Sequence, residues 1–587
     1  MRTSIAARAL CVALPGALFA AAGPPALGQI TVGPQTRVDA KPTGPCNETT
    51  VGVSKANPLE VVAAWNDYRE GTPRTGVALS LDGGETWSDF LLRPAPPFRS
   101  SVEGDPMTAH CDRTGTLWAG GMSFAGNGGI FVARKDPGSP TFGPPVMARV
   151  SGGVDKGWMV AGPRPGAPDE TNLYIAYNEG VIRSTDMGAS WSAPVSLGPG
   201  LGFLPRVGPG GELYVAYWNP DGAGDHMSLR RSFDAGASFG PEIVVALRMD
   251  VWGLDSSRTP GTYRNPHLAG LGVDPDDGTL YYVYPDTTDI QPNGFNVDVY
   301  FSRSTDQGAT WSTPVVVNTD AATPGDQFFP FADVDGNGRV HLVFHDTRGV
   351  VQQDSASTGL IDTYYAYSDD QGATWAEIDL TATPMDSALA FSGGFFIGDY
   401  LGIASAGRRT FPVYMDTDLG NADIYTNVVA DGPATEYCFG IGCPCGNDDP
   451  EAGCGNTGSD ADPSTGGHLA ASGTADISSD DLVLTMSGIR AGESLILAAS
   501  QNRNRVPFGD GFLCVAAPIF RYPLRRTDGS GAATYGPGEV IAISLGFGAA
   551  GQVVSGSTWS YMGWYRDPPS PCGSQFNTTN AVSVTWF

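Results

Sequence analysis

Short apolar runs recur along most of the chain, and turns rich in Gly, Pro, Asp and Asn separate them. Leu280–Tyr284 and Val340–Phe344 are two such runs, each preceded by a glycine-containing turn. In both cases an acid, Asp286 or Asp346, stands two residues after the run. Apolar runs of this length between turn residues predict β-strands joined by tight turns. The pattern therefore predicts an all-β protein built from repeated strand pairs.

A second pattern recurs between these runs, with the sequence Ser-x-Asp-x-Gly-x-Ser/Thr-aromatic. Its five copies are Ser80–Trp87, Ser184–Trp191, Ser232–Phe239, Ser304–Trp311 and Ser368–Trp375. In each copy the Asp carboxylate can accept backbone N–H groups of its own turn, and Gly can take a positive φ. The aromatic residue then starts the next strand. We therefore expect each octapeptide to form the turn of a β-hairpin.

These octapeptides resemble the Asp-box, or BNR repeat, of sialidase-like β-propellers, and the resemblance covers most of the chain. With them, each unit contains four strands, which is the composition of a propeller blade. Counting units predicts seven blades, whereas the sialidase resemblance implies six. In the second unit Asp136 marks a degenerate box. The seventh unit, Gly398–Val429, has only three strands, and we expect Ile30–Val38 to supply the fourth.

Length and charge limit the classes of function. At 587 residues the chain is long enough for several domains. Its formal net charge of −28 argues against nucleic acid as a partner. Residues 1–28 have the basic start, apolar run and small-residue end of a secretory signal peptide. No later segment is apolar enough for a membrane span. We therefore expect a secreted protein whose mature chain begins at Gln29.

The composition changes after the repeats. We expect a propeller over residues 29–430, a Cys/Gly/Asp-rich linker over 431–465, and a small disulfide-rich β-sandwich-like domain over 466–587. In this last domain Asp481–Met486, Ser494–Ala499 and Val540–Leu545 are predicted strands. The domain resembles modules at the C-termini of secreted planctomycete and deltaproteobacterial proteins, which implies attachment to a surface.

Eight cysteines remain once the signal peptide and its Cys11 are removed. Two lie in the repeats and six in the last quarter: Cys46, Cys111, Cys438, Cys443, Cys445, Cys454, Cys514 and Cys572. In an exported chain they predict disulfides, with a pairing that the sequence does not give. The rival interpretation is a zinc site at the 443, 445 and 454 positions, and their spacing is poor for one.

Blade topology assigns candidate residues to two faces. Turns between the first and second and between the third and fourth strands share one face, so the box carboxylates are expected to be structural: Asp82, Asp136, Asp186, Asp234, Asp306 and Asp370. The opposite face collects acids that we expect to bind substrate: Asp67, Glu179, Asp286, Asp346, Asp399 and Asp416. Their mixture with basic residues suits a polyhydroxylated ligand or a cation. The alternative is that each acid caps its own loop.

Sialidases use three arginines on the substrate carboxylate, a tyrosine nucleophile activated by a glutamate, and an aspartic acid/base. The resemblance thereby suggests Arg206, Arg264 and Arg348 as the arginines, Tyr400 as nucleophile and Asp105 as acid. These assignments follow from the expected face. The Phe/Tyr-Arg-Ile-Pro phrase that usually carries the first arginine of that family is absent.

Two functions therefore remain open. The first is a secreted protein that acts on glycans, with exo-sialidase or another glycoside hydrolase as the candidate activity. The second is a non-catalytic adhesion or scaffold propeller that binds carbohydrate or protein. No cofactor is required by either, and calcium is a candidate ligand. Asp333–Gly338 resembles half of a calcium loop, but Phe344 replaces its bidentate Glu, so a plain turn is favoured.

Overall fold

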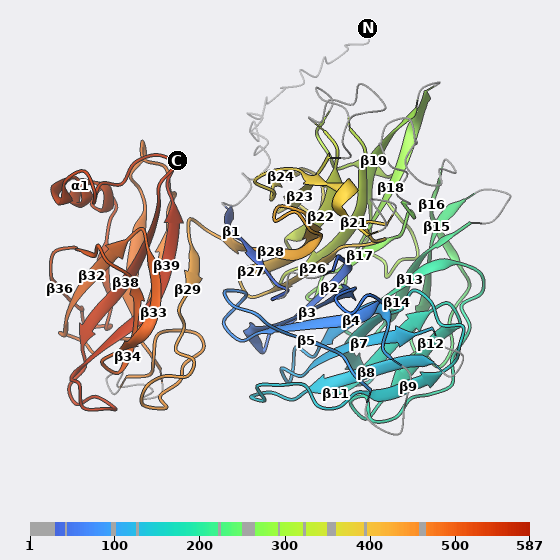
Figure 1. Ribbon diagram of the computed structural model, residues 1–587, viewed down its shortest axis with the longest axis horizontal. Helices are drawn as coiled ribbons and strands as arrows, with labels where there is room; N and C mark the ends of the chain where they lie inside the picture. The colour runs from blue at the N-terminus through green and yellow to red at the C-terminus, as the bar shows by residue number, and fades with distance from the viewer. Residues whose placement is uncertain are drawn as a thin grey trace, which may run out of the picture.

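The computed structural model describes residues 30–587 except 41–43, 95–100, 125–127, 221–224, 249–264, 292–293, 321–324, 349–359, 392–395 and 457–464. The predicted signal peptide therefore lies outside the described residues. Figure 1 shows a large body of radially arranged sheets joined to a smaller β domain that carries the C-terminus.

Seven antiparallel sheets make up the large body over the described residues. The first three contain β2 (Cys46–Ser54), β3 (Asn57–Asp67), β4 (Arg74–Ser80) and β5 (Ser88–Leu91); β6 (Gly104–His110), β7 (Leu117–Ser123), β8 (Gly129–Lys135) and β9 (Val146–Val150); and β10 (Trp158–Arg164), β11 (Ala167–Tyr177) and β12 (Gly180–Ser184). In the third sheet an isolated bridge between Val181 and Val195 stands where the fourth strand would be.

The remaining four sheets repeat this arrangement. They contain β13 (Leu201–Val207), β14 (Leu213–Asn219), β15 (His226–Ser232) and β16 (Ile243–Leu247); β17 (Gly270–Val273), β18 (Leu280–Gln291), β19 (Gly294–Ser304) and β20 (Val315–Val316); β21 (Gln327–Val334), β22 (Val340–Asp346), β23 (Leu360–Ser368), β24 (Ala376–Asp379) and β25 (Met385–Asp386); and β26 (Gly402–Ala406), β27 (Arg409–Asp416), β28 (Asp423–Asp431) and β1 (Ile30–Arg37). The innermost strands β2, β6, β10, β13, β17, β21 and β26 contact one another successively in a closed ring. This is a seven-bladed β-propeller, which confirms the count of seven.

The N-terminal strand completes the seventh blade. β1 pairs antiparallel with β28, from Ile30 opposite Asp431 to Arg37 opposite Tyr425. The side-chain amide of Gln35 adds a 2.6 Å hydrogen bond to the Asp416 carboxylate of β27. The prediction that Ile30–Val38 supplies the missing strand is confirmed, and the blade has no unpaired edge where β1 lies.

The octapeptides form the predicted turns. In the fifth blade the Asp306 carboxylate accepts hydrogen bonds from Thr310 N at 2.9 Å, Thr310 Oγ1 at 2.6 Å and Ser304 Oγ at 2.8 Å. Gly308 has φ +78° and donates to Ser304 Oγ. The other four copies repeat these bonds around Asp82, Asp186, Asp234 and Asp370. The degenerate box differs, because the exposed Asp136 carboxylate pairs with Arg134 instead.

The C-terminal domain packs a main sheet, in the order β29 (Thr435–Tyr437), β39 (Phe576–Thr585), β38 (Thr558–Arg566), β32 (Ser494–Ser500) and β35 (Phe520–Arg521), with β36 (Arg525–Arg526) also on β32. A second sheet holds β30 (His468–Ser472), β31 (Val483–Ser487) and β37 (Ala533–Tyr535), and β33 (Arg503–Phe508) pairs with β34 (Gly511–Val515). None of the helices among the described residues has the length and apolar character to cross a membrane.

Two sequence predictions for this region need correction. Part of the predicted linker 431–465 belongs to the domain, because Thr435–Tyr437 is a strand of its main sheet. Val540–Ser544 is the helix α1 rather than a strand. This short run buries Val540 and Ser544, four residues apart, which is the spacing of one helical face.

The cysteines divide into two groups. Three disulfides join Cys438 to Cys514, Cys443 to Cys454 and Cys445 to Cys572, all within the C-terminal domain. The zinc alternative is therefore excluded for these thiols. Cys46 and Cys111 are free and buried, which corrects the expectation that all eight form disulfides. Cys46 begins β2 whereas Cys111 follows the end of β6, so the two thiols lie at opposite ends of neighbouring inner strands.

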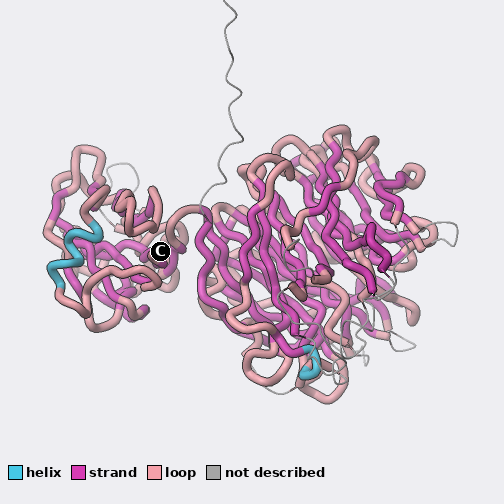
Figure 2. The backbone as a smooth tube through the Cα atoms, turned by 90° about the horizontal axis from the view of Figure 1, so that it is seen from above, coloured by secondary structure: helices cyan, strands magenta, loops and turns pink. Residues whose placement is uncertain are grey.

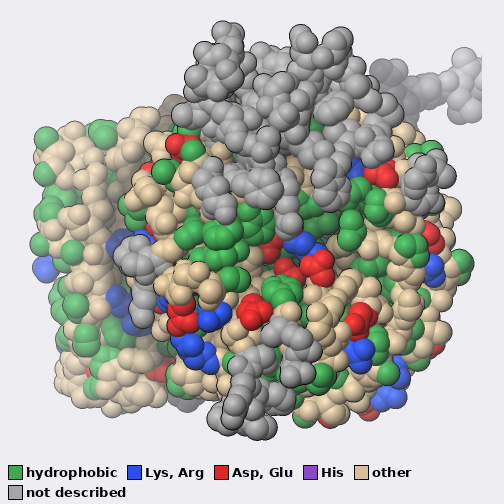
Figure 3. Space-filling view, turned by 45° about the vertical axis from the view of Figure 1, so that its right-hand side comes forward, with side chains coloured by type: hydrophobic (Ala, Val, Ile, Leu, Met, Phe, Trp, Pro, Cys, Tyr) green, Lys and Arg blue, Asp and Glu red, His purple; other side chains and the backbone are tan. Residues whose placement is uncertain are grey.

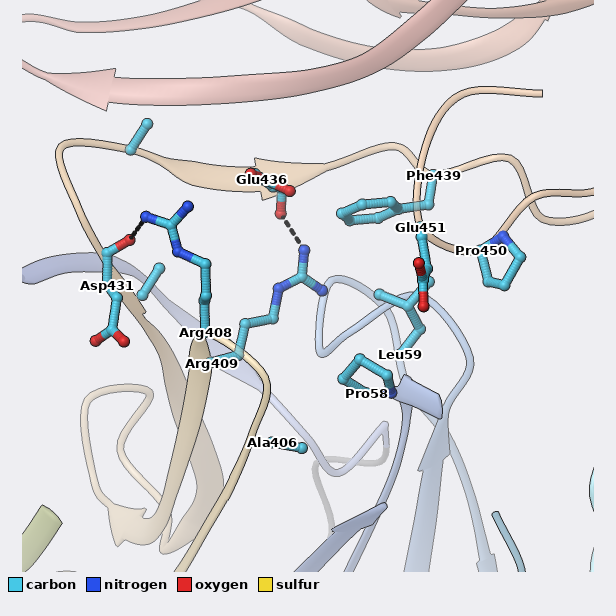
Figure 4. Close-up of a pocket in the computed structure, with 12 residues that line it drawn as sticks. Pro58, Leu59, Ala406, Arg408, Arg409, Asp431, Glu436, Phe439, Pro450 and Glu451 are labelled. Carbon is cyan, nitrogen blue, oxygen red and sulfur yellow. Dashed lines mark hydrogen bonds between the residues drawn. The ribbon is translucent and has the colours of Figure 1, made fainter. Parts of the chain in front are cut away.

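Arg409 lies where the two domains meet (Figure 4). Its side chain extends from β27 toward β29, where Nη2 donates a 2.8 Å hydrogen bond to Glu436 O. The guanidinium lies 4.6 Å from the centre of the Phe439 ring. Arg503 of the C-terminal domain adds an ion pair to Glu85, in the first octapeptide turn, at 3.2 Å. The small domain therefore docks on the propeller face that carries the octapeptide turns.

We expect Asp306→Ala to lower the free energy of unfolding by about 1–2 kcal/mol, because a capping carboxylate is lost. Urea unfolding followed by tryptophan fluorescence measures this. Hydrogen bonds from Thr310 lower the pKa of Asp306 to about 2. The stabilisation is therefore present above the unfolded pKa of about 3.9 and is lost as the pH falls through the folded value. Asp136→Ala is the matched control and should cost less than about 0.5 kcal/mol. Equal losses in both variants would contradict the structural role.

We expect Arg409→Ala to loosen the docking of the two domains, because it removes both the hydrogen bond to Glu436 O and the stacking on Phe439. Small-angle scattering should then show a larger radius of gyration. Arg408→Ala is the control, since among the described residues the neighbouring Arg408 makes its hydrogen bond to Asp431 O of its own blade, and it should leave the radius unchanged. An unchanged radius in Arg409→Ala would refute this role.

Candidate functional site

Six of the seven inner strands have a distorted segment at or just before their start, at the same end of the propeller. Non-glycine residues there have positive φ: Glu48 at 55°, Asp105 at 46°, Lys156 at 50° and Phe329 at 54°. Gly202 and Gly398 take the same position in two further blades, with φ of +66° and +104°. Irregular strand pairing occurs beside several of these positions, as expected for β-bulges. Left-handed backbone is costly for non-glycine residues, and it is characteristic of ligand-binding and catalytic sites.

Three of these residues meet at the mouth of the central channel. The Lys156 ammonium donates a 2.8 Å hydrogen bond to Glu48 and also bonds to Asp399. The backbone N–H of Lys156 donates to the Asp105 carboxylate at 2.8 Å. We call Glu48, Asp105, Lys156 and Asp399 the mouth cluster. In the space-filling view of Figure 3, acidic and basic side chains lie together near the middle of the propeller.

Asn66 of the first blade makes hydrogen bonds to two members of this cluster. Its side-chain amide donates to Glu48 at 2.7 Å, and its carbonyl oxygen accepts from Asp105 N at 3.1 Å. Glu48 and Asp399 are each only 1% exposed in their side chains. Burial raises the pKa of Glu48, the ammonium of Lys156 opposes this, and the carboxylates of Asp399 and Asp105 add to it. The cluster therefore holds several buried acids around one cation, and Glu48 keeps its proton to a higher pH than an ordinary glutamate does.

An aromatic layer closes the channel directly beneath the cluster. Trp158 lies 5.0 Å from Tyr400 and 6.0 Å from Phe331 between ring centres. The Lys156 ammonium lies 5.3 Å from the centre of the Tyr400 ring. The Tyr400 hydroxyl is buried and has no hydrogen-bond partner among the described residues. Burial and the nearby carboxylates of Glu48, Asp105 and Asp399 raise the pKa of Tyr400 well above its usual value, which disfavours the phenolate that a nucleophile needs.

Of the three arginines suggested by the sialidase resemblance, the two that the structure describes do not belong to the mouth cluster. Arg206 is the sixth residue of β13, four positions past the bulge at Gly202, so it lies toward the other end of the channel. This corrects its assignment to the mouth face. Arg348 bonds to Asp346 and Glu377, each at 2.6 Å. Arg264 lies outside the described residues.

Most of the acids expected to bind substrate instead cap nearby loops. Asp67 accepts Arg69 N at 2.9 Å, and Asp346 accepts Arg348 N at 2.6 Å. Asp416 accepts Thr417 N at 2.6 Å. Glu179 accepts bonds from Arg149, Ser151 and Tyr177, and Asp286 lies 3.9 Å from Arg248. Burial raises the pKa of Asp346 and of Asp416 to about 6. Of the six acids, Asp399 alone belongs to the mouth cluster.

The half calcium loop has the geometry of a turn. Asp335 accepts hydrogen bonds from Asn337 N at 2.8 Å and Arg339 N at 3.0 Å. Among the described residues, the one group of metal-binding side chains close enough to share an ion is Cys445, Asp510 and Cys572, whose two cysteines form a disulfide.

Glu48 is the member of the mouth cluster that the sequence interpretation missed. It stands at the start of β2, in the same structural position as Asp105 in the second blade and Lys156 in the third. An alignment of the first strands of all repeats would have shown three consecutive charged residues at this position. The acids that stand two residues after the apolar runs instead drew attention to the ends of the second strands.

Comparisons with known proteins give only distant similarities, and no family model matches the chain. A xyloglucanase of Acetivibrio thermocellus is 26% identical over 288 residues, which are 45% of this chain and 32% of that enzyme. The chain thus spans about a third of the length of this relative. An α-L-arabinofuranosidase of Fusarium graminearum is 13% identical, with a TM-score of 0.39 over 68% of this chain and 98% of that one. A Trypanosoma rangeli sialidase is 12% identical, with a TM-score of 0.33 over 94% of both chains.

We expect Lys156→Met to lower the free energy of unfolding by about 3 kcal/mol or more at pH 8, because buried carboxylates lose their cation. A carboxyl group whose folded pKa is raised stabilises the fold most below its unfolded pKa, and this stability is lost as the pH rises through the folded value. Glu48 has a folded pKa of about 8 in the wild type, and loss of the Lys156 cation raises it further. The stability difference between wild type and Lys156→Met should therefore grow as the pH rises above about 8, as measured by urea unfolding.

Two further variants test whether the loss in Lys156→Met comes from charge. Lys156→Arg keeps the cation and should lose less stability. Adding Glu48→Gln to Lys156→Met should recover part of the loss, which a double-mutant cycle measures. A deficit that is independent of pH and of Glu48 would show that Lys156 acts by packing alone.

Proposed function

We propose that this chain is an exported, glycan-directed propeller that hydrolyses a glycosidic bond at the mouth cluster. One observation carries the proposal: a single ammonium, that of Lys156, joins the buried carboxyl groups of Glu48 and Asp399 from two different blades. Glycoside hydrolysis usually needs two carboxyl groups in different protonation states, one acid and one ionised. Lys156 favours ionisation of its partners, whereas burial favours the protonated form of Glu48.

In this mechanism Glu48 protonates the leaving oxygen, and its hydrogen bond from Asn66 fixes the orientation of the carboxyl group. Asp399, which pairs with Lys156, acts in its carboxylate form as nucleophile or as base toward water. Asp105 adds negative charge that favours an oxocarbenium-like transition state. The reaction needs no cofactor. The xyloglucanase resemblance supports a polysaccharide or oligosaccharide as substrate.

The sialidase-type mechanism has less support from the geometry. It needs three converging arginines, whereas Arg348 is paired with two carboxylates and Arg206 lies toward the far end of the channel. The second candidate is a binding propeller without catalysis. The observation that favours it is that most acids of this face cap loops and are held by hydrogen bonds.

Export fits both versions. Residues 1–28 would direct secretion, and the three disulfides are the kind that persist in an oxidising compartment. The C-terminal domain would then attach the propeller to a surface. It docks on the face of the octapeptide turns, so such attachment would leave the mouth directed away from the anchor.

The test is hydrolysis of a panel of fluorogenic glycosides and xyloglucan oligosaccharides, sialosides included, by protein starting at Gln29. Assays run with calcium and with a chelator. We expect Glu48→Gln and Asp399→Asn each to lower kcat by about 10²–10⁴-fold. Wild-type kcat should fall as the pH rises through the raised pKa of Glu48, because the acid must carry its proton.

Glu179→Gln is the matched control, since Glu179 is an acid outside the mouth cluster that the side chains of Arg149 and Ser151 hold, and it should keep full activity. If folded protein turns over no substrate, hydrolysis is refuted for those glycosides. Glycan-array binding that Lys156→Met abolishes would then establish the binding version.

A further inference from the structure

The central channel contains a second polar compartment, separate from the mouth cluster. Below the aromatic layer lies a cavity of about 160 Å³, lined by the inner strands of all seven blades. Residues of turns between first and second strands, Lys55, Asp112 and Pro275, lie at its rim. The cavity therefore opens on the face of the octapeptide turns, opposite the mouth.

Arg206 supplies the main charge within this compartment. Its guanidinium makes one hydrogen bond to a described residue, from Nη1 to the adjacent Pro205 O at 3.1 Å. It forms no ion pair with any described carboxylate. Five N–H donors in a planar fork are suited to a carboxylate or phosphate. Most of those of Arg206 lack an acceptor among the residues that the structure describes. Arg206 is half-buried, so its remaining N–H groups are left to solvent or to a ligand in the cavity.

Asp333 is the acid whose charge acts on Arg206, but its carboxylate is hydrogen-bonded to another residue. Its carboxylate accepts a 2.6 Å hydrogen bond from Ser405 N, which ties β21 to β26. Its charge attracts the guanidinium only at longer range. At the rim, His110 lies 3.4 Å from Asp112, which leaves Lys55 as a second cation on the cavity wall. The cavity wall thus carries two cations, Arg206 and Lys55, beside two acids, Asp333 and Asp112, whereas the whole chain has a net charge of −28.

We propose that this compartment is a second binding site, which takes a small ligand bearing one carboxylate on the Arg206 guanidinium. The fork of the guanidinium can engage both oxygens of the carboxylate. A dianion such as phosphate fits less well, because Asp333 and Asp112 would repel the second charge. The aromatic layer of Trp158, Phe331 and Tyr400 separates this ligand from the mouth cluster, so the site is independent of the proposed hydrolysis.

The test is calorimetric titration of the full mature chain with sodium glucuronate, and with glucose as the uncharged match of similar size. We expect glucuronate to bind and glucose not to bind. Arg206→Gln should weaken glucuronate binding at least tenfold. Arg206→Lys keeps the positive charge but loses the planar guanidinium. Its affinity for glucuronate should lie between those of the wild type and of Arg206→Gln. Arg164→Gln, which removes an exposed arginine of a neighbouring turn, is the control and should bind as wild type does.

Two further measurements locate the site. Glu48→Gln, in the mouth cluster, should leave glucuronate binding unchanged. Loss of glucuronate binding in this variant would place the ligand at the mouth and overturn the proposal. Binding should also weaken as salt is raised, because the attraction is between charges. Absence of glucuronate binding to folded wild-type protein, or equal binding by Arg206→Gln, would overturn the proposal. Thermal unfolding, measured for each variant, is the control that tests whether the variant is folded.

Discussion

Closure of the ring by β1 is the constraint on which the propeller depends. Seven sheets surround one channel only if the last blade meets the first, and the seventh blade obtains its fourth strand from the N-terminal end of the described chain. This pairing joins residues about 400 positions apart in the sequence. It covers an edge that would otherwise present unpaired N–H and C=O groups. It also holds β26 beside β2, and thereby brings Asp399 to the same mouth as Glu48.

The ring converts a local distortion into a shared site. A bulge with positive φ at the start of an inner strand directs one side chain into the channel mouth, and the closed ring brings several such side chains together. Lys156 reaches Glu48 and Asp399 from sequence separations of 108 and 243 residues. Glu48, Asp105 and Lys156 have positive φ angles, which strain the backbone. This strain is tolerated because hydrogen bonds and ion pairs hold the three residues in place. The cluster is thus a product of closure rather than of any one blade.

The two faces of the propeller differ in their chemistry. One carries the octapeptide turns, whose carboxylates are satisfied within eight residues, and it also receives the C-terminal domain through Arg409 and Arg503. The other carries the mouth cluster and the loop-capping acids. The aromatic layer formed by Trp158, Phe331 and Tyr400 divides the channel between them. The mouth cluster and the polar cavity therefore lie on opposite sides of this layer.

The sequence by itself determined the features whose bonds are local. The strand-and-turn repeat, the octapeptide turns around Asp306 and its equivalents, and the seven units all follow from contacts within a few residues, and the missing strand of the seventh blade follows from the count. Only the tertiary structure decided which side chains meet. Glu48 was overlooked, Arg206 was assigned to the wrong end of the channel, and Cys46 and Cys111 were expected to be bonded, because each depends on where a strand begins and which distant strand lies beside it. Those positions are set by closure of the ring, and no short stretch of the chain encodes it.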